Sequence, residues 1–183
     1  GNGDNGTMIF LGLANNHEYL YRRFATNVII HDNYNHGSDT KHNDIAVVNI
    51  PFIEFNEYVQ SVPLSNMASL DNQIITVAGW GAINSTNFPD KLQYSILQVL
   101  NSTECERIFG PLNATQFCSH SFFQIACGGD AGGPVVLDSG REAKQVGIVS
   151  SESTDCVPNT TTIYTRISSY LPWIRRVTQI SGI

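Results

Sequence analysis

Residues 127–134 read Cys-Gly-Gly-Asp-Ala-Gly-Gly-Pro, so four glycines surround a single carboxylate, that of Asp130. Glycine adopts backbone angles, and allows close backbone approaches, that other residues do not. A turn of this kind can point several amide N–H groups at one spot and so bind an oxyanion. The plainer interpretation is a glycine-rich hairpin turn, and the rest of the chain decides between the two.

Length and composition restrict the class of protein. The chain has 183 residues, which predicts one domain, or two small ones that share a core. Hydrophobic residues make up 42% and charged residues 14% of the chain, a balance typical of a folded protein. The formal net charge of −6 argues against nucleic acid and against anionic membrane surfaces as partners. No apolar run reaches the roughly 18 residues of a membrane span, so no membrane insertion is expected.

The sequons and the cysteines indicate in which cellular compartment the protein folds. Five Asn-x-Thr sequons predict a secreted, extracellular glycoprotein, because such sites are modified on exposed surfaces in a secretory lumen. The candidate glycosylation sites are Asn5, Asn84, Asn101, Asn113 and Asn159. The four cysteines form no Cys-x-x-Cys pair, so no zinc site is expected, and we expect no other metal or cofactor. Secretion would permit disulfides, but the spacing of the cysteines leaves their pairing open.

The hydrophobic pattern predicts mostly strands. Short runs rich in Val, Ile, Phe and Thr recur between clusters of turn residues, as in a β-sandwich or a β-barrel. The expected strands are Met8–Leu13, Thr26–His31, Ile45–Ile50, Ile74–Gly79, Leu92–Leu100, Pro134–Leu137, Lys144–Ser150 and Thr161–Arg166. Two helices are expected as well, at Ser102–Phe109, where Ser102 and Thr103 precede Glu104, and at Ser168–Ile180.

The segment Gly129–Pro134 resembles the Gly-Asp-Ser-Gly-Gly-Pro nucleophile loop of trypsin- and chymotrypsin-like serine proteases. Four further motifs follow in the order of that family: Asn43-Asp44-Ile45-Ala46-Val47, Ala78-Gly79-Trp80-Gly81, Ile163-Tyr164-Thr165-Arg166, and Pro172-Trp173-Ile174 in a C-terminal helix. The resemblance runs from about Phe10 to the C-terminus. It implies an all-β fold of two antiparallel six-stranded β-barrels with the active site between them, followed by the C-terminal helix.

The resemblance also implies how the chain is divided. Residues 1–183 would form one trypsin-like peptidase domain without its N-terminal segment, with an incomplete first barrel to about residue 70. The second barrel and the helix would occupy about residues 71–183. Because the first barrel would lack its opening strands, we expect open strand edges and uncovered apolar faces there. A protein partner or a peptide, including the missing N-terminal segment, would cover them.

In the family, the cysteines would pair as Cys105–Cys118 and Cys127–Cys156. A third bridge that is common in the family would join the positions of Ile75 and Leu137. Both residues are apolar here, so we expect plain packing in place of that bridge.

The departures from the family decide the expected function. The resemblance places Ala131 at the position of the nucleophilic serine, and a methyl group cannot attack a carbonyl, so the chain as written is expected to be inactive. Asp44 takes the position of the triad aspartate, and Ser150 matches a serine that supports it. Gly129 and Ala131 take the positions whose N–H groups form the oxyanion hole.

Neither the histidine context nor the N-terminus of the family is found in this sequence. The histidines present lie in other contexts, and we expect them on the solvated surface: His17, His31, His36, His42 and His120. The family's Ile-Val-Gly-Gly amine, which pairs with the aspartate at the position of Asp130, is absent too. A buried carboxylate without a counter-charge is unfavourable, so we expect Asp130 to rotate toward solvent and the loop to take an inactive shape.

The specificity pocket differs from that of trypsin. Ile125 replaces the aspartate at the floor, Thr161 and Thr162 replace Pro-Gly, and Ser151-Glu152 replaces Trp-Gly. These changes remove an ion pair for Lys or Arg and narrow the pocket, so that only a small or apolar group should enter. The expected pocket residues are Ile125, Ser150, Ser151, Glu152 and Thr162.

Three functional interpretations remain. The first is a secreted pseudoprotease that binds rather than cuts and regulates a proteolytic cascade. The second is a serine-type endopeptidase seen as a partial chain, with serine replaced by alanine and the histidine supplied by a missing segment. The third is a fragment without a role of its own. The first explains Ala131, the altered pocket and the sequons together.

Overall fold

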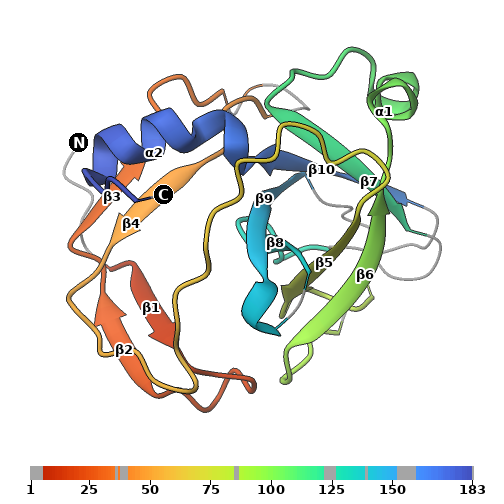
Figure 1. Ribbon diagram of the computed structural model, residues 1–183. Helices are drawn as coiled ribbons and strands as arrows, with labels where there is room; N and C mark the ends of the chain where they lie inside the picture. Colours follow the sequence, from red (N-terminus) through yellow and green to blue (C-terminus); the bar gives the residue numbers. More distant parts are fainter. Residues whose placement is uncertain are drawn as a thin grey trace.

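The computed structural model describes residues 6–35, 37, 41–84, 87–121, 127–138, 140–151 and 160–182. Within these ranges the chain forms ten β-strands, two α-helices and two short 3-10 helices, so the all-β expectation is confirmed. Figure 1 shows that the strands fall into two groups, with β1–β4 in one half of the molecule and β5–β10 in the other.

The second group closes into a barrel. Its strands are β5 (Ile74–Gly79), β6 (Gln93–Val99), β7 (Gln116–Ser121), β8 (Pro134–Leu137), β9 (Lys144–Ser151) and β10 (Thr160–Arg166). The order around the barrel is β10-β7-β6-β5-β8-β9, and every neighbouring pair is antiparallel. This half is therefore the expected six-stranded antiparallel barrel.

The barrel is filled by apolar side chains from all six strands. Val135 and Tyr164 are fully buried, and Ile75, Val99, Val146 and Val149 are nearly so. Ile75 and Leu137 face each other directly across β5 and β8, and both belong to this core. The expectation that these two apolar residues pack where the family has a bridge is confirmed.

The first group does not close within the described residues. There, β1 (Met8–Leu11) pairs with β2 (Tyr21–Phe24), and β3 (Asn27–Ile30) pairs with β4 (Ala46–Asn49), as two separate two-stranded sheets. Large apolar side chains are exposed on these strands, for example Phe24 at 56% and Ile30 at 57%. That these sheets belong to an incomplete first barrel stays a prediction.

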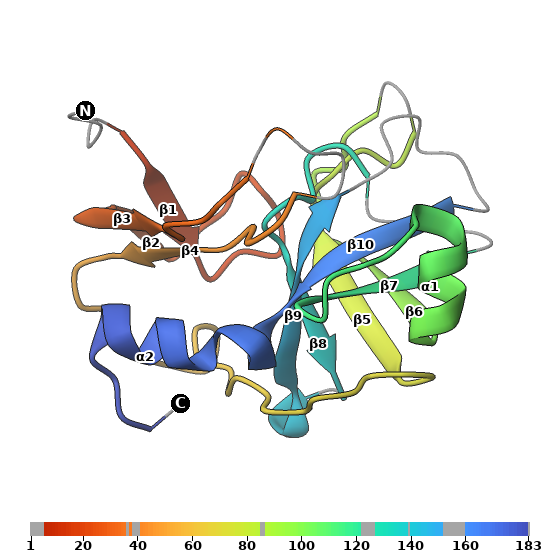
Figure 2. The same ribbon diagram turned by 90° about the horizontal axis from the view of Figure 1, so that it is seen from above.

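A helix from the end of the chain packs against the β3–β4 sheet of the first group. Helix α2 (Leu171–Thr178) follows the 3-10 helix η2 (Ile167–Tyr170) and runs alongside β3 and β4 (Figure 2). Tyr170, Trp173 and Ile174 are buried there against Ile45, which precedes β4. The expected C-terminal helix is present, although the residues before Leu171 form a 3-10 turn.

Helix α1 (Ser102–Phe109) has the expected bounds, but its cap differs from the Ser102/Thr103 start. Asn101 is the N-cap, and its side chain accepts a hydrogen bond from the Glu104 N–H at 2.9 Å. The helix is held to β7 by the Cys105–Cys118 disulfide, as the resemblance implied. Cys156 lies outside the described residues, so its pairing with Cys127 stays a prediction.

Two strands were not expected from the sequence. Strand β2 carries Arg22 and Arg23 between its aromatic ends, and β7 reads Gln-Phe-Cys-Ser-His-Ser, so neither shows an apolar run. In β7 the polar residues Gln116, Ser119 and Ser121 are nevertheless buried. Barrel closure buries both faces of this strand, and side-chain hydrogen bonds replace apolar contact on part of it.

Candidate functional site

Asp44 lies in the first half just before β4, and its hydrogen bonds reach the second half of the molecule. Asn43, just before it, has a positive φ of 56°, a conformation that asparagine tolerates better than most residues. The Asn43 side chain donates to the Asn33 carbonyl at 2.9 Å and accepts from the Tyr170 hydroxyl at 3.0 Å. Burial raises the pKa of Tyr170, so this phenol stays neutral and keeps donating at physiological pH.

Two residues from the second half contact Asp44, and Lys41 from the first half contacts one of them. The Ser150 hydroxyl donates to the Asp44 carboxylate at 2.8 Å, and the Thr165 hydroxyl donates to the Asp44 carbonyl at 2.9 Å. The Lys41 ammonium donates to the Ser150 carbonyl at 3.2 Å. The contact expected between Asp44 and Ser150 is therefore present, whereas Thr165 and Lys41 were not singled out from the sequence. Thr165 could have been noticed in the sequence, because it is a hydroxyl residue within the Ile163-Tyr164-Thr165-Arg166 motif.

The Asp130 carboxylate lies against the Gly79-Trp80-Gly81 segment. One carboxylate oxygen accepts from the Gly81 N–H at 2.9 Å, and the other accepts from the Cys127 N–H at 3.0 Å. A Cβ atom on either Gly79 or Gly81 would collide with this carboxylate. The two glycines on either side of Trp80 are thus the residues that make room for Asp130, a role that the motif itself did not reveal.

The expectation that Asp130 rotates toward solvent is wrong. Its side chain is half-buried and points inward, toward Gly79 and Gly81. The physical reason is that the Gly81 and Cys127 N–H groups are available as donors, and such donors stabilise a buried carboxylate. Finding donors inside the fold was therefore more favourable than turning outward.

The loop that follows Asp130 is tied to β9. The Gly132 N–H donates to the Val149 carbonyl at 2.8 Å, and the Val149 N–H donates to the Gly133 carbonyl at 3.0 Å. Gly129 and Gly132 have φ values of 102° and 85°, which explains why glycine is needed at both positions. Ala131 lies between them with an exposed side chain. The oxyanion role of the Gly129 and Ala131 N–H groups stays a prediction.

The expected specificity pocket is described only in part. Ile125 and Glu152 lie outside the described residues, whereas Ser151 ends β9 and pairs with Ile163 of β10. Thr162 is buried at 2% exposure and pairs with Ser119. The effect of these residues on what the pocket admits stays a prediction.

The histidines do not all lie on the solvated surface. His17 is 72% exposed and stands 3.2 Å from Asp90, as expected of a surface residue. His31 instead contacts the rings of Tyr170 and Trp173 at centroid distances of 5.4 and 5.0 Å, and its Nδ1 lies 3.2 Å from the Asn33 N–H. His42 and His120 are half-buried, and His36 lies outside the described residues. The docking of α2 against the β3 end is what covers His31.

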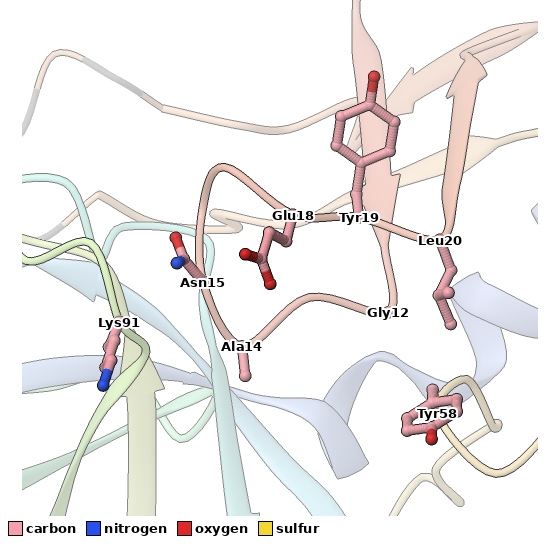
Figure 3. Close-up of a pocket in the computed structure, with 8 residues that line it drawn as sticks. All are labelled: Gly12, Ala14, Asn15, Glu18, Tyr19, Leu20, Tyr58 and Lys91. Atoms are coloured by element: carbon pink, nitrogen blue, oxygen red, sulfur yellow. The ribbon is translucent and has the colours of Figure 1, made fainter.

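A separate groove lies at the seam between the two halves, with a volume of about 430 Å³. Figure 3 shows its lining, which includes Glu18, Leu20, Tyr58 and Lys91. None of the residues that line it was expected in the site. Within the described ranges, no three His, Cys, Asp or Glu side chains are grouped so as to hold a metal ion, and no helix has the length and apolarity to cross a membrane.

The comparisons with known proteins agree with this geometry. The Trypsin family model matches residues 8–174. The chain is 30% identical over 192 aligned residues to Serine protease 1 of Drosophila melanogaster, covering 98% of this chain and 69% of that protein. It is 32% identical over 160 residues to Fibrinolytic enzyme, isozyme C, of Lumbricus rubellus, covering 79% of this chain and 66% of that protein.

A solved structure of HL collagenase has the same fold. It superposes with a TM-score of 0.85 at 30% identity, and the match covers 95% of this chain and 76% of that chain. The chain therefore belongs to the trypsin family, and its fold is of the chymotrypsin type.

Proposed function

We propose that this chain is a secreted, non-catalytic member of the trypsin family that acts by binding a peptide or a protein, and that it regulates a proteolytic cascade. The observation that carries the proposal is Ala131, the residue at the nucleophile position of the loop. Its methyl group has no lone pair, so it cannot form the covalent intermediate on which serine hydrolases depend. The five sequons and the Cys105–Cys118 disulfide support secretion.

The rest of the site supports binding without turnover. Asp44 and Ser150 are joined at 2.8 Å, and the Asp130 loop is tied to β9 through Val149. These contacts hold the Asp44 segment and the Asp130 loop in a defined shape that does not depend on the side chain at position 131. Such a surface can keep a bound peptide intact, as a decoy or a cofactor would.

The test compares the chain with its Ala131→Ser variant. Both are incubated with mixed peptide substrates and with a fluorophosphonate probe that labels activated serines. We expect no turnover by the parent chain, and neither turnover nor labelling by Ala131→Ser, because no imidazole takes the proton of the new hydroxyl. Turnover that survives repurification and inhibitor controls would overturn the proposal for the parent chain. Labelling at position 131 would show that a histidine completes the site.

The contact between Asp44 and Ser150 favours a second candidate function. In the family such a serine supports the triad aspartate, so the contact agrees with a serine endopeptidase seen as a partial chain, with its nucleophile serine replaced by alanine and the histidine on another segment. The intact mass and the N-terminal sequence of the protein from its natural source separate the candidates. An upstream segment that contains histidine, together with serine at position 131, would favour the endopeptidase.

The partner is expected to include strands that complete β1–β4. Phe24, Val28 and Ile30 on these strands are exposed at 56%, 42% and 57%, and Phe52, after β4, is exposed at 89%, which together form an unusually apolar surface facing water. Two-stranded sheets also have unpaired edges that accept further strands. A protein or a peptide, including an N-terminal segment of the family type, would cover them. An apolar dye should bind the chain alone and be released when such a segment is added; a dye signal that does not change would contradict this.

A further inference from the structure

Helix α1 is bracketed by two of the Asn-x-Thr sequons, at Asn101 and Asn113. At the start of the helix, the Asn101 Oδ1 accepts the Glu104 N–H at 2.9 Å, and the Glu104 carboxylate accepts the Asn101 N–H at 3.3 Å. This reciprocal pair is a capping box, which satisfies two amide groups that a helix start otherwise leaves unpaired. The cap uses the oxygen of the Asn101 amide and leaves its nitrogen available.

In Asn113, as in Asn101, the side-chain oxygen accepts a hydrogen bond and the side-chain nitrogen is not used within the described residues. Its Oδ1 accepts the Thr115 N–H at 3.3 Å, which forms a tight turn across the sequon, and its backbone carbonyl accepts the Gln116 N–H at 2.9 Å. The residue is exposed. In the part of the chain that the structure describes, neither Asn101 nor Asn113 uses its Nδ2 in a hydrogen bond.

We propose that Asn101 and Asn113 both carry N-linked glycans, and that these glycans cover the α1 face of the second barrel. This inference rests on the proposed secretion. The donor is a lipid-linked oligosaccharide diphosphate. The bond between sugar C1 and the diphosphate oxygen breaks, a bond forms between C1 and Nδ2, one amide proton is lost, and the lipid diphosphate leaves. The Oδ1 atoms, which hold the cap and the turn, take no part in the new bond.

The other sequons do not offer the same geometry. Asn5 and Asn159 lie outside the described residues. Asn84 sits in a short turn, in which the Asn87 N–H donates to the Asn84 carbonyl and the Asn87 carbonyl accepts the Ile83 N–H. That turn packs on the nucleophile loop through the hydrogen bond between the Ala82 N–H and the Gly128 carbonyl at 2.9 Å. A glycan there would stand beside the candidate site, unlike the two near α1.

The position of α1 determines which face of the molecule the glycans would shield from a partner. In both Figure 1 and Figure 2, α1 lies at the end of the molecule opposite to β1–β4. Glycans on Asn101 and Asn113 would therefore shield the α1 face and leave the exposed apolar side chains of β1–β4 accessible. We infer that the partner approaches the β1–β4 half and not the α1 face.

Matched variants separate the loss of a glycan from the loss of the helix cap or the turn. Asn101→Asp and Asn113→Asp keep the oxygen that accepts the N–H groups, since aspartate is as good an N-cap as asparagine, but they cannot be glycosylated. Thr103→Ala removes the first sequon and leaves Asn101 intact. Thr115→Ser keeps the second sequon and its hydroxyl, and serves as the control that should stay glycosylated.

The experiment expresses the full chain behind a signal peptide in eukaryotic secretory cells. Mobility is compared before and after peptide N-glycosidase, and the converted asparagines are mapped by mass spectrometry. We expect one glycan to be lost in Asn101→Asp and in Thr103→Ala, one in Asn113→Asp, and none in Thr115→Ser. Finding either site unmodified in folded, secreted chain would overturn the proposal. Peptidase assays on unglycosylated chain test the non-catalytic role separately, so the two failures are distinguishable.

Discussion

The closed barrel of β5–β10 and the open sheets of β1–β4 differ in how they exclude water. In the barrel, each strand has a neighbour on both sides, and eleven buried residues form one core cluster. In the open half, each sheet in the described residues has two strands, and the β3–β4 sheet makes its apolar contacts with helix α2 through Ile29 and Val47. The comparison shows that the burial of the β3–β4 sheet depends on a segment from the far end of the chain. The first half is therefore expected to lose its structure more readily than the barrel.

Hydrogen exchange should show the largest contrast between the two halves. We expect central amides of β5 and β6 to exchange at least ~1000-fold more slowly than those of β1 and β3, because barrel amides open only with the whole fold. Mass spectrometry of peptides from the purified chain measures both sets in one experiment. Equally slow exchange in both halves would mean that the open sheets are already fully supported.

The core of the barrel should be sensitive to the loss of side-chain volume. Leu97 is 5% exposed in β6, and its neighbour Ile96 is 65% exposed on the same strand. Leu97→Ala should lower the free energy of unfolding by about 2–5 kcal/mol, because a cavity remains in a packed core. Ile96→Ala, and Ile30→Ala in the open half, should each change it by less than about 1 kcal/mol. Urea unfolding measures all three variants. A similar loss of unfolding free energy in all three would contradict the expected difference between the barrel core and the exposed positions.

Alkaline pH should act on the barrel through Tyr164. Burial raises the pKa of this phenol from 10.0 to about 12, and its hydroxyl lies 2.8 Å from the Ser119 hydroxyl. Because the folded pKa exceeds the unfolded one, the neutral form contributes stability that is fully present below pH 10 and is lost as the pH rises toward 12. The loss should amount to roughly 2–3 kcal/mol.

The control for this titration is a phenylalanine at the same place. Tyr164→Phe should flatten the decline in unfolding free energy over this alkaline range, whereas Tyr94→Phe, at a side chain that is 66% exposed, should not. Identical pH profiles for the parent chain and Tyr164→Phe would contradict the assignment to this residue.

The smallest effect is expected at the ion pair between the open half and α2. Asp32 follows β3 and lies 3.3 Å from Arg176, with both side chains largely exposed. Asp32→Asn should change the free energy of unfolding by less than about 1 kcal/mol, because water and salt screen an exposed pair. A larger loss in thermal unfolding would mean that this pair, and not the apolar contacts of Trp173, holds α2 in place.

Much of the barrel could be predicted from local pattern. The bounds of β5, β8 and α1 agree with the sequence-based prediction, because each shows a clear apolar run or a helical pattern between turn residues. Strands β2 and β7 were missed because their sequences lack such a run. Gln116, Ser119 and Ser121 are buried only because β7 lies between β6 and β10, a relation between distant segments.

The candidate site divides in the same way. The motifs around Asp44 and Ala131 could be found in the sequence, because the backbone shape that they need restricts the residues locally, as the glycines on both sides of Asp130 do. The identity of residue 131 is likewise a matter of sequence alone: a methyl group, and not a hydroxyl, stands at this position. These conclusions required no knowledge of which segments meet in space.

Only the tertiary structure decided where the charged groups find their partners. Asp130 turns inward because Gly79 and Gly81, which are far from it in the sequence, leave space for its carboxylate, and Gly81 and Cys127 provide two N–H donors. Lys41 reaches the Ser150 carbonyl, and Thr165 reaches the Asp44 carbonyl, across the seam between the halves. Hydrogen bonds act over about 3 Å, so segments far apart in the chain exert them only after folding has brought them together. The sequence by itself thus determined which chemical groups this protein has, and the packing of its two halves determined which of them meet.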